Sequence, residues 1–223
     1  MEALHPNHVW QSDMTKVWAG PSVGWAYLVL VIDCCTREIV GWNLSLRCRT
    51  EEALAALNRA VLEVLPFGSG GTGLTLTTDN GTQFTSAQYV ETLNLLGITH
   101  RRTAYNHPEG NSYIERFHCS LKEEEVWLDE YENLDQAKLS IARWTEEYNH
   151  DRPHRGLRGR TPTMLVRSWF KPSLQTRPQV SSFEGCTTRR LQVYPISGLQ
   201  NPPCLCKVFG HQLRNCVLSR RVK

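Results

Sequence analysis

The order of the apolar patterns is the feature that most constrains the fold of this chain. Strand-like runs lie at residues 9–15, 25–33 and 38–46, and a turn at residues 34–37 separates the second run from the third. The Ala- and Leu-rich stretch at about 50–65 has the periodicity of an amphipathic helix, and Thr-Glu-Glu suits its start. Three strands followed by a helix predict an α/β layer architecture.

The rest of the chain up to about residue 165 continues the alternation. In chain order we expect a loop at 66–73, a strand that leads to Asp79, a helix near 86–96, a short strand at 98–102, a helix that carries Glu115 and a helix near 133–149. These elements add up to a mixed five-stranded sheet flanked by helices. A stretch of this length can bury a full hydrophobic core, so we expect one domain over residues 8–165.

Three acidic residues stand in distinctive contexts: Asp13 in WQSDMT, Asp79 in LTLTTDNGTQF and Glu115 in NSYIERFHCSLKEEE. The last two are separated by 35 residues, the spacing of metal-dependent DNA strand-transfer enzymes. Such chemistry uses two divalent cations about 3.5–4 Å apart, and Mg²⁺ prefers oxygen ligands. Because the chain has 22 Asp and Glu, the spacing alone is a weak signal, and the contexts have to support it.

The contexts of the two aspartates allow a functional and an ordinary interpretation. Asp79 follows a short apolar strand and precedes the turn dipeptide Asn80-Gly81, so it lies at a strand end where it could point into a site. It could equally form an Asx turn or cap the helix near Ser86. Asp13 lies in an alternating strand pattern, either in a site or as a surface aspartate.

Glu115 begins a helical pattern whose apolar members are Ile114, Phe117, Leu121, Val126 and Leu128. Residues 115, 118, 119 and 122 then share one helix face. On this face Glu115 could bind metal and Lys122 could contact a DNA phosphate, with His118 and Cys119 between them to shape the site or contact DNA. A solvated charged stripe is the alternative, because residues 122–125 form a charge run.

A loop with Gly and Pro directly precedes this helix. It contains Tyr105, His107 and Asn111, which we expect to contact a DNA end by stacking or hydrogen bonding. A passive connector is the alternative interpretation.

These stretches together resemble the integrase core, the retroviral-integrase-like DDE catalytic domain found in bacterial insertion-sequence transposases made from two overlapping reading frames. The matching segments are WQSDMT, VIDCCTREIVGW, TDNGTQF, IERFHCSLKEE and WTEEYNHDRPHRGLRGRTP, which cover residues from about 8 to 165. The resemblance implies a ribonuclease-H-like fold. It assigns metal binding and catalysis to Asp13, Asp79 and Glu115, and DNA contact to Lys122. It also makes Asp33 a hairpin residue without a catalytic role.

The resemblance further implies the reaction and the partners. Two Mg²⁺ or Mn²⁺ ions would assist water in attacking a phosphodiester at the end of a mobile element, and the freed 3′ hydroxyl would attack target DNA. Expected partners are element-end and target DNA, further copies of this chain on DNA, and the product of the upstream reading frame. That product would supply DNA recognition, because the residues before Asp13 leave no space for a helix-turn-helix.

Charge divides the chain unevenly. Residues 1–170 hold 16 Lys and Arg against 21 Asp and Glu, a net charge of −5, whereas residues 171–223 hold 9 against 1, a net charge of +8. We expect this basic, Pro-rich tail to be disordered. It would attract phosphates without reading sequence. It could instead be a read-through or frame-shifted extension whose charge has no function.

The cysteines of the tail raise the question of zinc. Four residues, Cys204, Cys206, His211 and Cys216, come close to the pattern of a nucleic-acid-binding zinc knuckle. The first pair is one residue tighter than the usual zinc spacing, so coincidence is the simpler interpretation.

No stretch approaches the ~20 apolar residues that span a membrane, and the first residues do not resemble a signal peptide. We therefore expect a bacterial cytoplasmic protein associated with the nucleoid and without a membrane partner. Two other functions stay open: a ribonuclease-H-like nuclease, and a non-catalytic nucleic-acid-binding remnant of a transposase.

Overall fold

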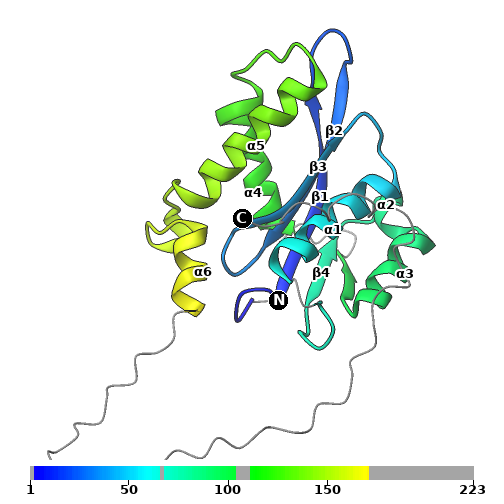
Figure 1. Cartoon of the computed structure of the whole chain (residues 1–223), viewed down its shortest axis with the longest axis vertical. Coiled ribbons are helices and arrows are strands. Elements are labelled where there is room, and N and C mark those ends of the chain that lie inside the picture. Colours follow the sequence, from blue (N-terminus) through cyan, green and yellow to red (C-terminus); the bar gives the residue numbers. More distant parts are fainter. Residues whose placement is uncertain (1–2, 66–67, 104–110, 171–223) are drawn as a thin grey trace, which may run out of the picture. The chain divides into compact units, whose positions relative to one another are not determined.

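The protein is described by a computed structural model of its 223 residues, of which 3–65, 68–103 and 111–170 are described below (Figure 1). The backbone divides into two units, Met1–Ser173 and Leu174–Lys223. The described residues all belong to the first unit. The tail and its four zinc-ligand candidates, together with Tyr105 and His107, lie outside them.

A mixed five-stranded sheet forms the centre of the first unit, which confirms the predicted fold class. The strands are β1 (Val9–Trp18), β2 (Trp25–Asp33), β3 (Ile39–Ser45), β4 (Thr75–Thr78) and β5 (Thr99–Arg102), in the order β3-β2-β1-β4-β5. β1, β2 and β3 pair antiparallel, whereas β4 pairs parallel with both β1 and β5. The first three strands are therefore a meander, and the last two are reached through helices.

Helices cover both faces of this sheet. They are α1 (Thr50–Val64), α2 (Thr82–Thr85), α3 (Ala87–Leu96), α4 (Ser112–Leu121), α5 (Leu134–His150) and α6 (Pro162–Phe170), with a π-helical segment, η2 (Lys122–Val126), after α4 and a 3₁₀ turn, η3 (Arg155–Leu157), after α5. The sequence patterns predicted the four long helices but neither α2 nor α6. They also placed Leu128 on the apolar face of the α4 helix, whereas it lies beyond η2 and is 72% exposed.

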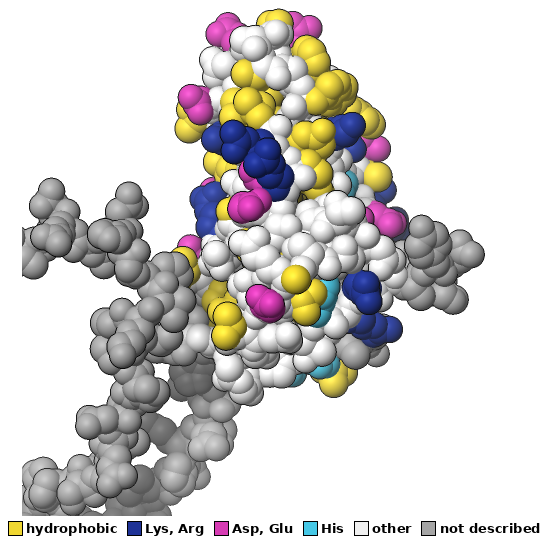
Figure 2. Space-filling model, turned by 90° about the vertical axis from the view of Figure 1, so that its right-hand side faces the viewer, with side chains coloured by type: hydrophobic (Ala, Val, Ile, Leu, Met, Phe, Trp, Pro, Cys, Tyr) yellow, Lys and Arg dark blue, Asp and Glu magenta, His cyan; other side chains and the backbone are white. Residues whose placement is uncertain are grey.

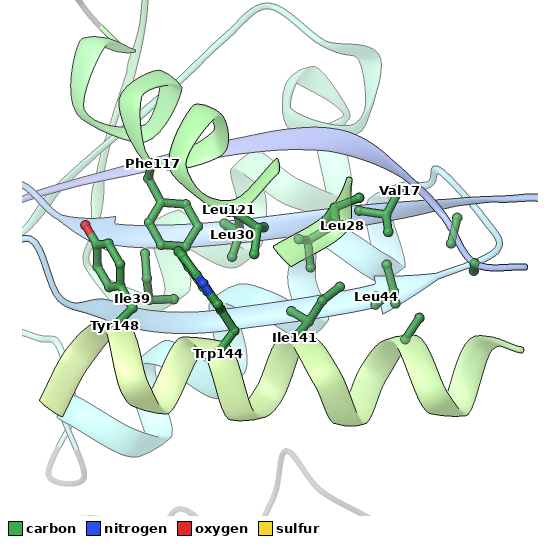
Figure 3. Packing of buried hydrophobic residues seen from close by; sticks show 14 of the residues in the cluster. Val17, Leu28, Leu30, Ile39, Leu44, Phe117, Leu121, Ile141, Trp144 and Tyr148 are labelled. Carbon is green, nitrogen blue, oxygen red and sulfur yellow. The ribbon is translucent and has the colours of Figure 1, made fainter. Parts of the chain in front are cut away.

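Two hydrophobic clusters lie on opposite faces of the sheet because side chains alternate along a strand. In β2, Leu28, Leu30 and Ile32 pack toward α4 and α5, whereas Val29 and Val31 pack toward α1 and α3. Figure 3 shows the first cluster, where Ile141, Trp144 and Tyr148 of α5 and Phe117 and Leu121 of α4 meet the strands. The sheet is thus the middle layer of three.

Two close contacts fix the helices against β3. The side chain of Asn149, near the end of α5, accepts a hydrogen bond from the Ile39 backbone N–H at 2.9 Å and donates one to the Ile39 carbonyl at 3.0 Å. On the other face, Gly41 lies so near α1 that a Cβ there would be 2.4 Å from the Ala56 carbonyl oxygen. Both residues belong to the scaffold that supports the sheet.

The end of the β1–β2 hairpin next to its turn is apolar and exposed. Trp18 and Trp25 face each other across the hairpin with ring centroids 5.4 Å apart, and 44% and 58% of their surfaces are exposed. Figure 2 shows hydrophobic side chains gathered over the upper part of one face, at the height where Figure 1 places this hairpin end. In the described ranges, no helix is long and apolar enough to cross a membrane.

Candidate active site

The two aspartates lie side by side on neighbouring parallel strands. The register of β1 and β4 pairs Ser12 with Thr78, the residues that directly precede Asp13 and Asp79. Asp13 lies within β1, which extends three residues beyond the predicted strand, and Asp79 follows the last residue of β4. Residues 66 positions apart in the chain are therefore neighbours because of strand pairing.

The side chain of Asp13 lies on the α4 side of the sheet. Gln11, Asp13 and Val17 share one face of β1, and Val17 packs in the cluster with Phe117 and Leu121 of α4. The oxygen Oε1 of Gln11 accepts a hydrogen bond from the backbone N–H of Ile114 at 3.2 Å. This bond fixes the first turn of α4 over β1, one residue before Glu115.

The pKa of Asp13 reflects the nearness of the other two acids. Its pKa is raised from 3.8 to about 6, first by burial and further by the negative charges of Asp79 and Glu115. A hydrogen bond of 2.7 Å from the Met14 backbone N–H and the positive charge of Lys122 act in the opposite direction. Three other predicted site residues are thus close enough to affect this one carboxyl group.

His118 lies between these groups and is buried, with 8% of its surface exposed. Its Nδ1 is 3.5 Å from a carboxylate oxygen of Asp13. Burial and then the charge of Lys122 lower the pKa of His118 from 6.5 to about 4, so the ring is neutral near pH 7. Its Nε2 has no hydrogen-bond partner among the described residues. The structure therefore places His118 beside Asp13, and its contact with DNA stays a prediction.

Lys122 lies where α4 passes into η2. Its backbone N–H still bonds to the carbonyls of Cys119 and His118, and its own carbonyl accepts from Trp127, five residues on. A π turn changes the phase of a helix and is frequent at functional sites. Lys122 stays on the side of Asp13 because α-helical bonding continues up to it, while residues 123 and 124 are exposed. The helical pattern predicted this face of Lys122 but not the π turn.

Asp79 forms the Asx turn that the sequence left open, and its charge also reaches Asp13. Its Oδ1 accepts a hydrogen bond from the Gly81 backbone N–H at 3.0 Å, which is an Asx turn, and its charge acts on Asp13. Asp33, in contrast, is 1% exposed and accepts hydrogen bonds from the backbone N–H groups of Asn7, Cys35 and Thr36. The structure therefore places Asp33 in the β2–β3 hairpin, away from the three acids.

Asn111 directly precedes α4 and is the one residue of the predicted DNA-binding loop that the structure describes. Only 6% of its surface is exposed, and its Oδ1 has no hydrogen-bond partner within the described ranges. Gln11 is the site residue that the sequence patterns missed. Its only signal was the alternation WQSD, which also sets Asp13 on the same face.

The donor set of this site fits a hard divalent cation. It consists of carboxylates from β1, the end of β4 and α4, and burial, together with the negative charges of the other two, raises the pKa of Asp13. In the residues that the structure describes, no three His, Cys, Asp or Glu side chains form a closed cluster around a single point. The charges of Asp79 and Glu115 thus reach Asp13, although the described side chains do not form a metal-ligand group as they stand.

Two overlapping family models, both described as integrase core domain, match residues 3–108 and 96–162. A Lactococcus lactis transposase for insertion sequence element IS904 is 32% identical over 162 residues, which are 72% of this chain and 62% of that protein. An Escherichia coli putative transposase for IS150 is 28% identical over 77% of this chain and 58% of its own length. The chain thus spans little more than half the length of these relatives.

Solved structures agree on the fold. A simian T-cell lymphotropic virus intasome in complex with a PP2A regulatory subunit contains a chain with a TM-score of 0.62 and 22% identity, covering 85% of this chain and 63% of that one. The HTLV-2 integrase catalytic core domain, solved in complex with magnesium, has a TM-score of 0.54 and 18% identity over 73% of this chain and 97% of its own. The chain therefore belongs to the integrase core domain family, as a DDE-type core of the kind found in insertion-sequence transposases.

Proposed function

We propose that this chain is the catalytic domain of a metal-dependent transposase that cleaves the 3′ ends of a mobile DNA element and joins them to target DNA. One observation carries the proposal: Asp79 and Glu115, which come from separate elements, both act on the buried carboxyl of Asp13. Three carboxylates brought together against their own repulsion are the ligand set of a divalent cation.

Asp13, Asp79 and Glu115 would hold two Mg²⁺ or Mn²⁺ ions, which supply activation of the attacking oxygen and stabilisation of the leaving oxygen. The protein's own groups hold and orient the DNA. Lys122, on the Asp13 side of the α4–η2 junction, would bind a phosphate of the reacting strand. Neutral His118 packs against Asp13 and limits its movement. Water attacks first, and the freed 3′ hydroxyl then attacks the target phosphodiester, with no covalent protein intermediate.

The partners belong to the same proposal. The names of the similar proteins include an intasome and a core solved with magnesium, which supports assembly of several copies on DNA and a divalent cation here. A protein from an upstream reading frame would direct the catalytic domain to the element ends. The site of action would be the bacterial nucleoid, in the cytoplasm. Tyr105, His107 and Asn111 would contact the DNA end next to Glu115.

The test is nicking and joining of a labelled linear DNA at low salt with Mg²⁺ or Mn²⁺. The parent should produce both products, and Asp79→Asn should lose both while its thermal unfolding stays unchanged. Asp135→Asn, the same chemical change at an exposed residue in the first turn of α5, is the matched control and should keep activity.

Each alternative outcome has a distinct meaning. If Asp79→Asn retained the activity of the parent, the metal-site assignment would be wrong. Nicking without joining by the parent would indicate a nuclease. DNA binding without nicking, even with the upstream protein added, would indicate a non-catalytic remnant.

A further inference from the structure

A cavity lined by arginines and aromatic rings lies beside α4, on a helix face adjacent to that of Glu115. Its volume is about 410 Å³, and we call it the arginine pocket. Tyr113, Arg116, Phe117 and Ser120 line it from α4 at the spacing of one helix face. The β2–β3 turn contributes Arg37, and the segment after α5 contributes Arg152, His154 and Arg155.

The charges of the arginine pocket are unbalanced. None of the residues that line it is acidic. Arg152 is neutralised by paired hydrogen bonds to Glu124 of η2. Arg116 and Arg155, in contrast, have no ion pair and no side-chain hydrogen bond among the described residues. The pocket therefore concentrates positive charge in a part of the chain whose net charge is negative.

Arg37 adds a donor that the fold leaves unused. Its guanidinium lies over the ring of Tyr113, 3.1 Å from the centroid. The atom Nη1 is buried and has no hydrogen-bond partner within the described ranges. Leaving a buried charged donor unpaired is costly, so such a group commonly marks a position where a ligand is missing.

The backbone holds these cations in place. Arg37 has a positive φ of 66° in the β2–β3 turn, where its N–H donates to the Asp33 carbonyl at 2.8 Å. Arg155 begins η3, in a loop closed by hydrogen bonds between His154 and Arg160. Below them, Tyr148 packs edge-on against Phe117 and His154 at 4.7 and 4.5 Å. The pocket thus has a rigid aromatic floor, of which Figure 3 shows Tyr148 and Phe117.

We infer that the arginine pocket binds a backbone phosphate of a DNA strand at a site separate from the three acids. Arginine forks match phosphate oxygens in geometry and charge, and the 40% exposed Tyr113 offers a face for an adjacent sugar or base. Because Arg116 directly follows Glu115 on α4, a strand in the active site can continue into the pocket. The inference rests on the proposed function, since it takes DNA as the ligand.

The experiment measures DNA binding without catalysis. Fluorescence anisotropy of a labelled 20-base-pair duplex, in EDTA and over a series of salt concentrations, compares the parent with Arg116→Gln and Arg155→Gln. The matched control is Arg167→Gln, the same charge change at an exposed residue of α6 outside the pocket. Residues 171–223 are identical in all four proteins, so the differences report on the pocket.

Each pocket variant should weaken binding several-fold and reduce the salt slope by about 0.9, the value for one lost phosphate contact. Arg167→Gln should match the parent. Equal affinities for all four proteins, or an equal loss in all three variants, would overturn the inference. The inference would also be overturned if inorganic phosphate raised the melting temperature of the parent but not of the pocket variants while their DNA affinities stayed the same. The pocket would then hold a free anion.

The inference and the proposed function can fail separately. A parent that nicks and joins DNA while the pocket variants bind DNA normally would remove only the pocket assignment. A parent that does not bind DNA at all would contradict both. An acidic protein segment that binds the parent but neither pocket variant, while DNA affinity stays the same, would assign the pocket to that class of ligand instead.

Discussion

At the scale of single residues, burial beside other acids raises the pKa of a carboxyl in two places, with different consequences. At Asp13 the neighbours are proposed metal ligands, and a cation can offset the repulsion. At Glu38, in the β2–β3 turn, they are Asp33, Glu63 and Glu146, which belong to the scaffold. In the protein alone both raised pKa values cost stability at neutral pH, but only the cost at Asp13 would be offset by a bound cation.

Glu38→Gln should therefore stabilise the fold at neutral and higher pH. Burial first, and then the three acids, raise the pKa of Glu38 from 4.5 to about 7. Between these values the unfolded chain loses the proton that the folded chain keeps, so stability falls as pH rises, by on the order of 3 kcal/mol once pH exceeds 7. Urea unfolding should show equal stability for parent and variant at pH 4 and a more stable variant at pH 8.

The matched control is Glu91→Gln on the exposed face of α3, which should leave the unfolding free energy nearly unchanged at both pH values. If the unfolding free energies of the parent and of Glu38→Gln differed by the same amount at pH 4 and at pH 8, the effect would be steric and unrelated to ionisation.

At the scale of elements, close packing of α1 on β3 depends on the absence of a side chain at Gly41. A Cβ there would lie 2.4 Å from the Ala56 carbonyl oxygen and 2.8 Å from the Ala60 backbone nitrogen and Cβ. Gly41→Ala should therefore push α1 away from the sheet and lower the unfolding free energy by about 1–3 kcal/mol. Chemical denaturation measures this loss.

Gly70→Ala provides the comparison, because a Cβ at Gly70 would meet no atom within 4 Å. It should be neutral or slightly stabilising, through the reduced freedom of the unfolded chain. If both variants lost the same stability, the loss at Gly41 would not be due to the contact with α1.

The elements also show how far the sequence leads. Period-2 and helical patterns predicted every strand and the long helices, because those patterns reflect which side is buried. They did not predict α2, which is one turn long, or η2, whose π turn breaks the period between Leu121 and Leu128. They also did not predict α6, although its apolar residues are arranged as in an amphipathic helix; only Pro162 of its nine residues is buried.

For the site, the sequence led to the acids but not to the arginine pocket. Asp79 and Glu115 lie in strand-end and helix-start contexts and Asp13 lies within a strand, and the sequence motifs around all three singled them out. Arg37 and Arg155 are separated by more than a hundred residues and each has the local pattern of ordinary surface charge. Only the packing of the β2–β3 turn and the end of α5 around α4 brings them together.

At the scale of the whole chain, the net positive charge and the hydrophobic clusters lie in different segments. Residues 1–173 hold 17 Lys and Arg against 21 Asp and Glu, a net charge of −4, and residues 174–223 hold 8 against 1, a net charge of +7. Both hydrophobic clusters consist of residues between Trp10 and Tyr148. Stability should therefore depend on the first segment, and long-range attraction to DNA on the second.

A chain that ends at Ser173 should melt within about 2 °C of the full chain, a difference of less than about 1 kcal/mol at this size. Its affinity for duplex DNA should fall, and its salt slope should become smaller, because seven net positive charges are lost. Scanning calorimetry and anisotropy measure the two effects.

A full-length chain in which residues 174–223 are scrambled keeps the charge and should recover the affinity if only charge matters. A much lower melting temperature for the shortened chain would show that the segment beyond Ser173 contributes to the folded core, and failure of the scrambled chain to recover affinity would show that its sequence, and not only its charge, contacts DNA.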